Sequence, residues 1–351
     1  MKLVKSLFGP KTRGRSISFA LVIVAYIVIS ILQSAGSIPR MISSLLVPVC
    51  CYIVAAIGLN MNVGISGELN LGQAGFMSVG GFSAAITNAV LLNTVSNDFV
   101  RLLICIVIGA LIAGFVGWLI SIPVLKLEGD YLAIVTLAFG QIIMSLMNNL
   151  YVGFDADGIH FGFINNTMQL GEGGKMIVSG PMGVTGNKMI STFTVGFILI
   201  LISLLVVYNI IYSKEGRAIQ ACRDNKIAAE TIGIKVSSTK TLAFVVSSAL
   251  GGAAGALYMM NYSSVAATKF YFNSSILILV YVVLGGLGNM TGTLISTSVL
   301  VLLPEMLRFL SSYRMLVYAI VLIVMMIVTN NEQIKTFFEK FKKQKGVQAH
   351  E

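Results

Sequence analysis

Residues 192–233 decide the fold, because they join an apolar run, TFTVGFILILISLLVVYNIIY (192–212), to a charged segment, EGRAIQACRDNKIAAETIG (215–233). A second apolar run, Leu242–Tyr258, follows. Each run is about long enough to cross a bilayer as a helix, since roughly 20 apolar residues span the hydrocarbon core. The charged segment therefore lies between two predicted membrane spans, where a partner outside the bilayer can contact it.

The composition extends this pattern to the whole chain. Its 351 residues are 56% hydrophobic and 11% charged, with a mean hydropathy of +0.88, whereas soluble domains average about 25% charged residues. Continuous apolar runs also argue against a β-barrel, whose strands give alternating segments of about ten residues. We predict an all-α polytopic membrane protein with about 8–10 transmembrane segments, some of them broken or re-entrant.

The basic residues predict which parts face the cytoplasm. Of the 24 Lys and Arg, five precede the first span, six lie at 214–240 and five follow the last span. An excess of Lys and Arg marks cytoplasmic loops, and this distribution argues against a nucleic-acid-binding protein. We expect a basic cytoplasmic N-terminus (1–16), a single transmembrane domain (17–330) with an outer loop (151–191) and a cytoplasmic loop (213–238), and a basic cytoplasmic tail (331–351).

Nine apolar runs are candidate spans, and one of them is interrupted by the glycine-rich sequence LGGLGN (284–289). As a single crossing, 275–303 would place the basic tail outside, against the charge pattern. We therefore predict two short segments, 275–288 and 291–303, that meet at the break and return the chain to the outer side. The other runs cover 17–35, 41–59, 72–92, 100–124, 130–150, 192–212, 239–262 and 315–329.

A second glycine-rich break lies in the first half, GLNMNVGISGELNLGQ (58–73). The spacing of Asn70 and Gln73 predicts a capping box that opens a helix. Paired discontinuous helices mark transport pathways, although glycines also let membrane helices pack closely. The pathway candidates, for which ordinary interhelical packing and hydrogen bonding are the alternative, are Asn60, Asn62, Glu68, Asn70, Gln73, Gln141, Gly285, Gly286 and Gly288.

The sequence contains no catalytic or metal-binding constellation that we recognise. GEGGK at 171–175 lacks the glycine spacing and the Ser/Thr of a phosphate-binding loop. Asp155 and Asp157 begin a calcium-like loop without its other ligands, which favours a solvated turn. The four cysteines show no disulfide or metal spacing and are expected to be buried apolar side chains. We predict no enzymatic activity, no metal site and no cofactor bound by this chain.

Within the charged segment, apolar residues recur every three to five positions. This pattern predicts a short surface helix that presents one apolar stripe to a groove in a partner. An amphipathic helix on the inner leaflet is the alternative, against which three interspersed acidic residues argue. The stripe consists of Ile219, Cys222, Ile227, Thr231 and Ile234, and the acidic residues are Glu215, Asp224 and Glu230.

Several collinear motifs resemble the permease subunits of branched-chain amino acid ABC importers. The resemblance covers about residues 45–330 and is greatest to the longer of the two permease types in these systems. The motifs are GELNLGQAGF (67–76), YLAIVTLAF (131–139), GPMGVTG (180–186), RAIQACRDNKIAAETIGI (217–234), KTLAF (240–244), GGAAGALY (251–258) and VVLGGLG (282–288).

The resemblance implies a heteromeric importer in the plasma membrane of a bacterium. Its partners would be two cytoplasmic ABC ATPase subunits that bind ATP and magnesium, a second, paralogous permease subunit, an extracytoplasmic solute-binding protein and membrane lipid. The implied cargo is a branched-chain amino acid or a related small polar solute. By position, the ATPase-coupling residues would be Glu215, Arg217, Arg223, Asp224, Asn225, Ala228, Ala229, Glu230 and Gly233.

Three departures from the family pattern leave the solute open. The segment Thr329–Glu332 lacks the usual Arg-Pro-Gln-Gly type of ending, Glu68 and Gln73 stand where Gln and His are frequent, and Asn165–Ser179 enlarges the outer loop. Urea, amides and nucleosides are alternative solutes. A stand-alone channel or facilitator, which needs no ATPase, is the alternative mechanism.

Overall fold

The structure, a computed structural model, describes residues 13–36, 39–92, 94–127, 129–155, 158–163, 174–308 and 313–330. The chain forms two compact units, Met1–Thr297 and Ser298–Glu351. The predicted basic tail and most of the predicted basic N-terminus lie outside the described residues, as does Ser311, beside the predicted outer end of the last span.

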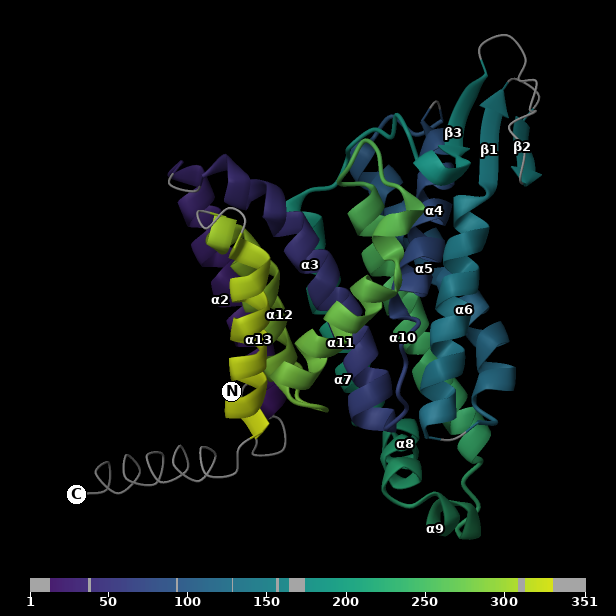
Figure 1. The fold of residues 1–351 in the computed structure, drawn as a ribbon, viewed down its shortest axis with the longest axis vertical. Coiled ribbons are helices and arrows are strands. Elements are labelled where there is room, and N and C mark those ends of the chain that lie inside the picture. Colours follow the sequence, from purple (N-terminus) through teal and green to yellow (C-terminus); the bar gives the residue numbers. More distant parts are fainter. Residues whose placement is uncertain are drawn as a thin grey trace, which may run out of the picture. The chain divides into compact units, whose positions relative to one another are not determined.

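Long apolar helices build the first unit (Figure 1). Eight stretches of the described residues are long and apolar enough to cross a membrane, which confirms the prediction of a helical polytopic membrane protein. The helices are α2 (Arg13–Ser34), α3 (Arg40–Asn60), α4 (Gln73–Leu91), α5 (Asp98–Val124), α6 (Asp130–Asn148), α7 (Phe193–Ile211), α10 (Val236–Met259), α11 (Phe272–Gly285) and the start of α12 (Met290–Met306); α13 (Arg314–Asn330) belongs to the second unit.

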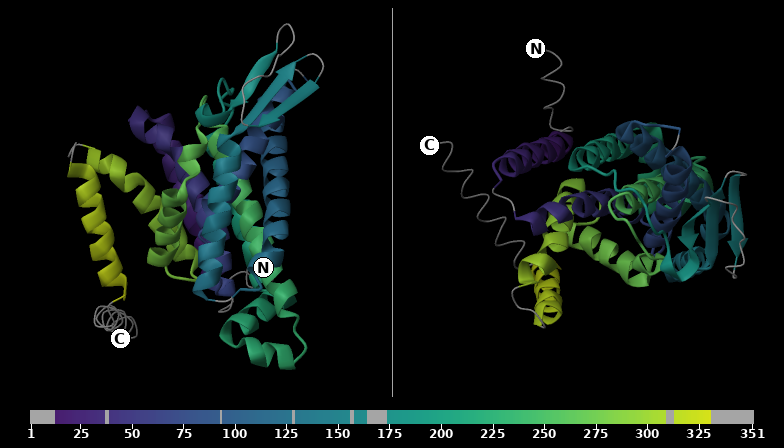
Figure 2. Two further views of the ribbon diagram at one scale, coloured as in Figure 1. Left: turned by 45° about the vertical axis from the view of Figure 1, so that its right-hand side comes forward. Right: turned by 90° about the horizontal axis from the view of Figure 1, so that it is seen from above.

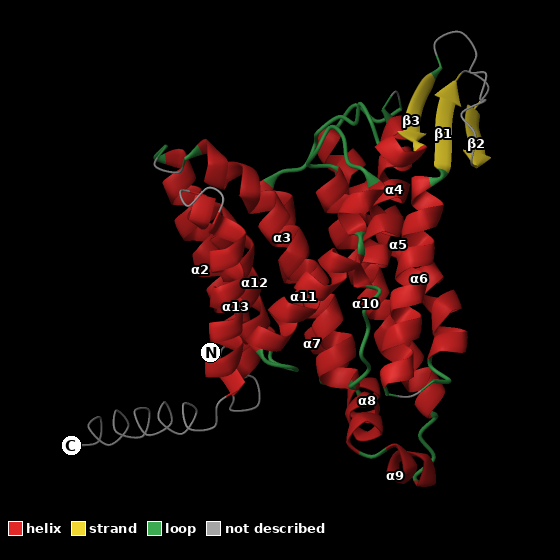
Figure 3. Cartoon of the chain, in the orientation of Figure 1, coloured by secondary structure: helices red, strands yellow, loops and turns green. Residues whose placement is uncertain are grey.

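Two smaller structures lie at opposite ends of the helices of the first unit (Figures 1 and 2). At one end, β1 (Leu150–Asp155), β2 (Gly158–Phe163) and β3 (Lys175–Ser179) form an antiparallel sheet in the order β2-β1-β3, and the 3-10 helix η2 (Gly180–Met182) follows (Figure 3). At the other end are α8 (Lys214–Asp224) and α9 (Lys226–Thr231). The sheet is an addition to the predicted all-α fold, and it forms part of the predicted outer loop.

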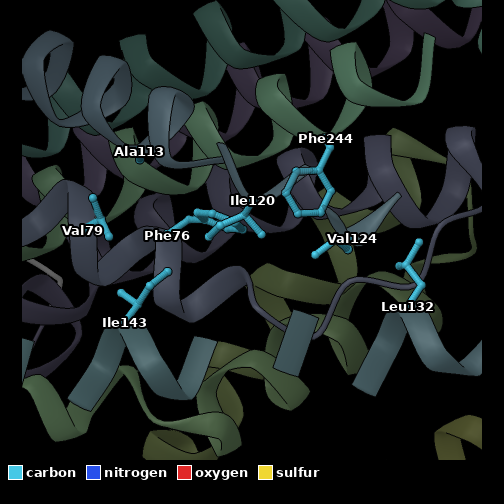
Figure 4. Packing of buried hydrophobic residues seen from close by; sticks show 8 residues of the cluster. All are labelled: Phe76, Val79, Ala113, Ile120, Val124, Leu132, Ile143 and Phe244. Atoms are coloured by element: carbon cyan, nitrogen blue, oxygen red, sulfur yellow. The ribbon is translucent and has the colours of Figure 1, made fainter. Parts of the chain in front are cut away.

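The core of the first unit lies where α10 packs against α3, α4 and α5. Phe76 and Phe244 meet edge to face there, with ring centroids 5.6 Å apart and planes at 86°. A Cβ added to Gly252 would meet the backbone oxygen of Gly109 at 2.6 Å, so small residues allow this close approach. The buried apolar cluster contains Phe76, Val79, Ala113, Ile120, Val124, Leu132, Ile143 and Phe244 (Figure 4).

The four cysteines behave as the sequence predicts. Cys50, Cys51, Cys105 and Cys222 are all buried and none forms a disulfide. Cys222 lies outside the membrane helices, where burial raises the pKa of its thiol. These side chains therefore serve as small apolar packing groups.

Both predicted helix breaks are present. In the first half, α3 continues into a π-helical turn, η1 (Met61–Ser66), and an irregular stretch at 67–72 precedes α4. In the second half, the 3-10 helix η3 (Ala267–Phe270) leads into α11, and the chain breaks again between α11 and α12. Gly286 and Gly288 have φ values of +90° and +80° in this second break, a conformation that costs glycine little.

Candidate functional site

The two helix breaks contact each other, and Asn60 joins them. This side chain is fully buried at the end of α3. Its Nδ2 donates to the Thr293 Oγ1 of α12 at 2.8 Å, and its Oδ1 accepts a hydrogen bond from the Gly288 backbone nitrogen at 2.8 Å. One amide therefore connects both halves of the sequence. We call residues 60–66 and 285–293 together the junction.

Glycines make the junction compact. A Cβ added to Gly64 would collide with the Asn60 side chain and would lie 2.9 Å from the Gly288 Cα. A Cβ added to Gly285 would lie 2.5 Å from the Thr293 backbone nitrogen. Gly286 lies between Gly285 and Gly288 and forms the turn of the second break. The junction therefore contains five of the predicted pathway candidates: Asn60, Asn62, Gly285, Gly286 and Gly288.

Polar atoms without partners lie along the first break. Asn62 and Ser66 are buried in η1, and neither amide atom of Asn62 nor the Ser66 Oγ has a hydrogen-bond partner among the described residues. The Nδ2 of Asn70 is also buried and unpaired within the same part of the chain. Buried polar atoms are normally bonded to protein or water. These three residues are therefore candidates to contact water or solute.

The predicted capping box at Asn70 and Gln73 is wrong. Gly72 is the N-cap of α4, and the Asn70 Oδ1 accepts a hydrogen bond from the Gly72 backbone nitrogen at 2.8 Å. Gln73 instead donates to the carbonyl oxygens of Ala55 at 3.3 Å and Ser247 at 3.2 Å. Its side chain satisfies groups of α3 and α10 that are distant in the sequence, and this tertiary role overrides the local cap.

Gln141 lies on α6, outside the junction. It is half-buried on α6, and α6 packs against α4, α5 and α11. None of the hydrogen bonds seen among the described residues links it to the junction. Gln141 therefore takes no part in the hydrogen bonds seen at the junction.

The charged segment forms two helices that meet at Asn225. The backbone nitrogen of this residue donates to the Ala221 oxygen at 3.0 Å and ends α8, while its side-chain Oδ1 accepts from the Ala228 backbone nitrogen at 3.0 Å and begins α9. Asn is strongly preferred at an N-cap. The prediction of one continuous apolar stripe is therefore wrong, because the bend at Asn225 divides it. Ile219 is fully buried, whereas Ile227 is 75% exposed.

Gly233 ends α9 and turns the chain towards α10. Its φ is +86°, and the Ile234 backbone nitrogen donates to the Ala229 oxygen at 3.0 Å. This is the pattern of a Schellman cap, in which glycine is strongly preferred. Ala229 packs in a small apolar cluster with Cys222 and Val236, so the helix pair has its own core.

The predicted coupling residues therefore divide by exposure. Ala229 is buried within the helix pair. The other eight are exposed and available to a partner: Glu215, Arg217, Arg223, Asp224, Asn225, Ala228, Glu230 and Gly233.

Two polar contacts connect this region to the first break. The Arg223 Nη1 donates to the Gly64 backbone oxygen at 2.9 Å, and the same guanidinium pairs with Asp224 at 3.0 Å. Lys240, near the start of α10, forms an ion pair with Glu68, and their side chains are only 15% and 11% exposed. The residues Ser66–Leu69, Gly129, Asp130, Cys222–Lys226 and Lys240 line a cavity of about 320 Å³ at this place.

Sequence reasoning did not single out Gly64, Lys240 and Thr293, which contact the two breaks in the structure. Gly64 lies inside the predicted break but has no side chain to mark it, and Thr293 stands in an apolar run. Lys240 offered a signal, because a lone charge at the edge of a span needs a partner, and Glu68 stands at another predicted edge. The sequence alone does not pair Lys240 with Glu68, because that pairing depends on tertiary contacts.

Asn60→Leu is expected to destabilise the protein by about 2–4 kcal/mol. The substitution removes a hydrogen bond to the buried Thr293 hydroxyl and takes the acceptor from the part-buried Gly288 N–H, and each buried polar group left unsatisfied costs about 1–3 kcal/mol. Thermal unfolding of the purified protein in detergent measures the change. Asn149→Leu is the matched control, because that exposed amide donates only to the Ser145 oxygen of its own helix. Equal melting temperatures for the two variants would contradict the role of Asn60.

Comparison with known proteins identifies one family. The family model described as "branched-chain amino acid transport system / permease component" matches residues 41–329. The chain is similar to the high-affinity branched-chain amino acid transport system permease protein LivM of two bacteria. It is 32% identical to LivM of Salmonella typhimurium over 346 residues and 32% identical to LivM of Escherichia coli over 341 residues. Each alignment covers 93% of this chain and 78% of the relative.

A more distant relative is the nucleoside ABC transporter permease protein NupC of Lactococcus lactis, which is 25% identical over 194 residues, covering 55% of this chain and 58% of that protein. No solved structure matches the chain. The family match spans both helix breaks and the pair α8–α9, and it confirms the resemblance seen in the motifs. The chain belongs to the family of permease components of branched-chain amino acid transport systems.

Proposed function

We propose that this chain is the membrane-spanning permease subunit of an ABC importer for branched-chain amino acids or related small polar solutes. Permeases of this family are transport subunits rather than enzymes. The observation that supports the coupled mechanism is the direct contact of α8 and α10 with the first helix break through Arg223 and Lys240. This contact gives a partner on α8–α9 a mechanical route to the junction.

In this mechanism, two ATPase subunits bind ATP and magnesium and move the exposed pair α8–α9 as they close. Arg223 and Lys240 pass the movement to the backbone of Gly64 and the side chain of Glu68. Asn60 then carries it to the second break. Interfaces of this packed kind switch between discrete arrangements rather than deform continuously, so the junction opens or closes as a unit.

The proposal also assigns the sides of the membrane. The pair α8–α9, with its basic residues, faces the cytoplasm together with both termini. The sheet at the opposite end then faces outward, where an extracytoplasmic binding protein delivers the solute. A second, paralogous permease completes the pore, and membrane lipid surrounds the helices.

Reconstitution tests this function. The purified permease pair, placed in vesicles with its ATPases and binding protein, is expected to accumulate radiolabelled leucine only when ATP is present on the ATPase side. Uridine in place of leucine tests the alternative suggested by the similarity to the nucleoside permease. Equal leucine uptake by vesicles that lack the ATPases would contradict the importer and support a facilitator.

Neutralising either member of the Glu68–Lys240 pair is expected to reduce ATP-dependent uptake by roughly tenfold or more. Removing one partner leaves the other charge largely buried without compensation, which costs about 3–5 kcal/mol. The double reversal Glu68→Lys with Lys240→Glu restores an ion pair and is expected to recover much of the activity. Uptake by Glu68→Gln, Lys240→Gln and the double reversal measures this, and a double reversal no better than either single variant would contradict it.

A further inference from the structure

The first span, α2, holds a fully buried hydroxyl between two other helices. The Ser18 Oγ lies 2.7 Å from the Tyr208 hydroxyl of α7 and 2.6 Å from the Thr291 Oγ1 at the start of α12. All three residues belong to the first unit. The family match covers residues 41–329, so α2 and this contact lie outside the part of the chain that identifies the family.

Thr291 is part of the junction. It stands two positions before Thr293, whose Oγ1 accepts the hydrogen bond from the Asn60 Nδ2 at 2.8 Å. Between the two threonines, a Cβ added to Gly292 would lie 2.9 Å from the Gly285 carbonyl carbon, so α12 begins tightly against the end of α11. The first turn of α12 is therefore held by the first break through one threonine and by α2 through the other.

Aromatic side chains fasten α2 to α7. Next to the buried serine, the ring centroid of Phe19 lies 6.2 Å from that of Tyr208. About two helical turns further along α2, the Tyr26 ring stacks on the rings of Phe193 and Phe197, with centroids 5.6 and 4.1 Å away. Aromatic pairs of this kind add to the energy of burial. We therefore expect α2 and α7 to move together.

The same helix, α7, leads directly into α8. Ser213 is the N-cap of α8, and its Oγ donates to the Ile210 carbonyl oxygen at 2.7 Å and accepts from the Gly216 backbone nitrogen at 3.1 Å. A Cβ added to Gly216 would collide with the Ile210 carbonyl oxygen, so the two helices touch with no space between them. A movement of α8 is therefore expected to displace the end of α7, which carries Tyr208.

We infer that α2 is a second coupling arm, in which Ser18 is a positioning residue that links α7 to the second helix break. Movement of α8 passes to Tyr208 and, through the Ser18 hydroxyl, to Thr291. A buried hydroxyl has no water to replace a lost partner, so the three hydroxyl groups stay together as the helices move. Arg223 and Lys240 act on the first break, and this arm acts on the second. The inference rests on the proposed function and adds a role for α2.

The number of ATP molecules hydrolysed per leucine taken up tests the inference in the complete importer. Tyr208→Phe separates α7 from Ser18, and Thr291→Val separates the second break from it, while both substitutions keep the shape of the side chain. Each is expected to raise the ratio about threefold to tenfold, because the ATPases still cycle while fewer cycles move the second break. The net contribution of one hydrogen bond corresponds to about this range in an equilibrium constant.

The order of the contacts predicts how the substitutions combine. Tyr208→Phe and Thr291→Val interrupt the same link, so the double variant is expected to show the ratio of either single variant rather than the product of the two effects. Tyr26→Phe is the matched control. It removes another hydroxyl contact between α2 and α7, at 3.4 Å from the Thr194 Oγ1, but keeps its stacked ring, and it should keep the wild-type ratio.

The outcomes separate this inference from the proposed function. An unchanged ratio in Tyr208→Phe and Thr291→Val, in an importer that accumulates leucine with ATP, would overturn the second arm and leave the importer intact. A lower melting temperature with an unchanged ratio would show that the hydroxyl groups only stabilise the fold and would also overturn it. The same rise in Tyr26→Phe as in Tyr208→Phe would overturn the route through Ser18. Leucine uptake that needs no ATP would instead contradict the proposed function.

Discussion

Gly64→Ala is expected to abolish ATP-dependent transport, although it adds only one methyl group. The new Cβ would collide with the Asn60 side chain and would lie 2.9 Å from the Gly288 Cα, so the two breaks cannot keep their contact. The obstacle is mostly backbone, which cannot rotate away as a flexible side chain can. Overpacking of this kind typically costs about 1–3 kcal/mol. Here it would disrupt the junction, which the proposed mechanism requires.

Leucine uptake by reconstituted vesicles and the melting temperature of the same preparation measure the effect together. Gly114→Ala is the matched control, because the nearest atom to its Cβ would be the Ala249 Cβ at 3.3 Å, where a shift of a few tenths of an ångström suffices. We expect that control to retain most of its uptake. A fully active Gly64→Ala protein would show that the breaks need not touch.

Ile227→Asp is expected to uncouple the permease from the proposed ATPase partners. Ile227 and Ile232 are each 75% exposed on and beside α9, although isoleucine is usually buried. If they are the apolar anchors that enter a groove of the ATPase, loss of one removes about 2 kcal/mol or more of association free energy. An exposed substitution of this kind changes folding stability by only about 0.5 kcal/mol.

Co-purification of the ATPase with the permease measures this directly, and leucine uptake reports the consequence. We expect at least about thirtyfold weaker association, the equivalent of roughly 2 kcal/mol. Met182→Asp is the control for an exposed apolar residue, since Met182 is 69% exposed in η2, which directly follows β3, and it should retain the ATPase. Wild-type association of the Ile227→Asp protein would exclude α9 as the anchor.

Much of the fold could be predicted because the hydropathy of a segment depends only on the residues within that segment. The break at 284–289 was predicted from glycine placement and charge topology, and α11 and α12 indeed end and begin around it. The sheet was missed because its strands are five or six residues long, too short for a clear alternating pattern. The bend at Asn225 was missed because one residue serves as the end of one helix and the cap of the next.

The site could be predicted only as a list of residues. The structure shows where the candidates around the breaks lie, but their partners could not be predicted, because these depend on contacts between distant parts of the chain. Asn60 bonds to Gly288, 228 positions away, and Gln73 bonds to Ser247, 174 positions away. Local spacing therefore suggested a cap where tertiary packing supplies the partner.

The connection between α8 and the first break is the centre of the proposed mechanism, and a reversible cross-link tests it most directly. A Cβ added to Gly67 would lie 3.6 Å from the Arg223 Cβ, within the range of about 3.5–4.5 Å found in disulfides. The protein to test carries Gly67→Cys and Arg223→Cys, with Cys222→Ala to prevent pairing with the neighbouring native thiol.

ATP-dependent leucine uptake by this protein, reduced and then oxidised, is the decisive measurement. The reduced form has lost the bond from Arg223 to the Gly64 oxygen and is expected to transport poorly. Oxidation joins α8 to the break covalently and is expected to restore uptake, which should fall again after reductant is added. Normal uptake in the reduced form, or no recovery once the disulfide has formed, would contradict transmission through this contact.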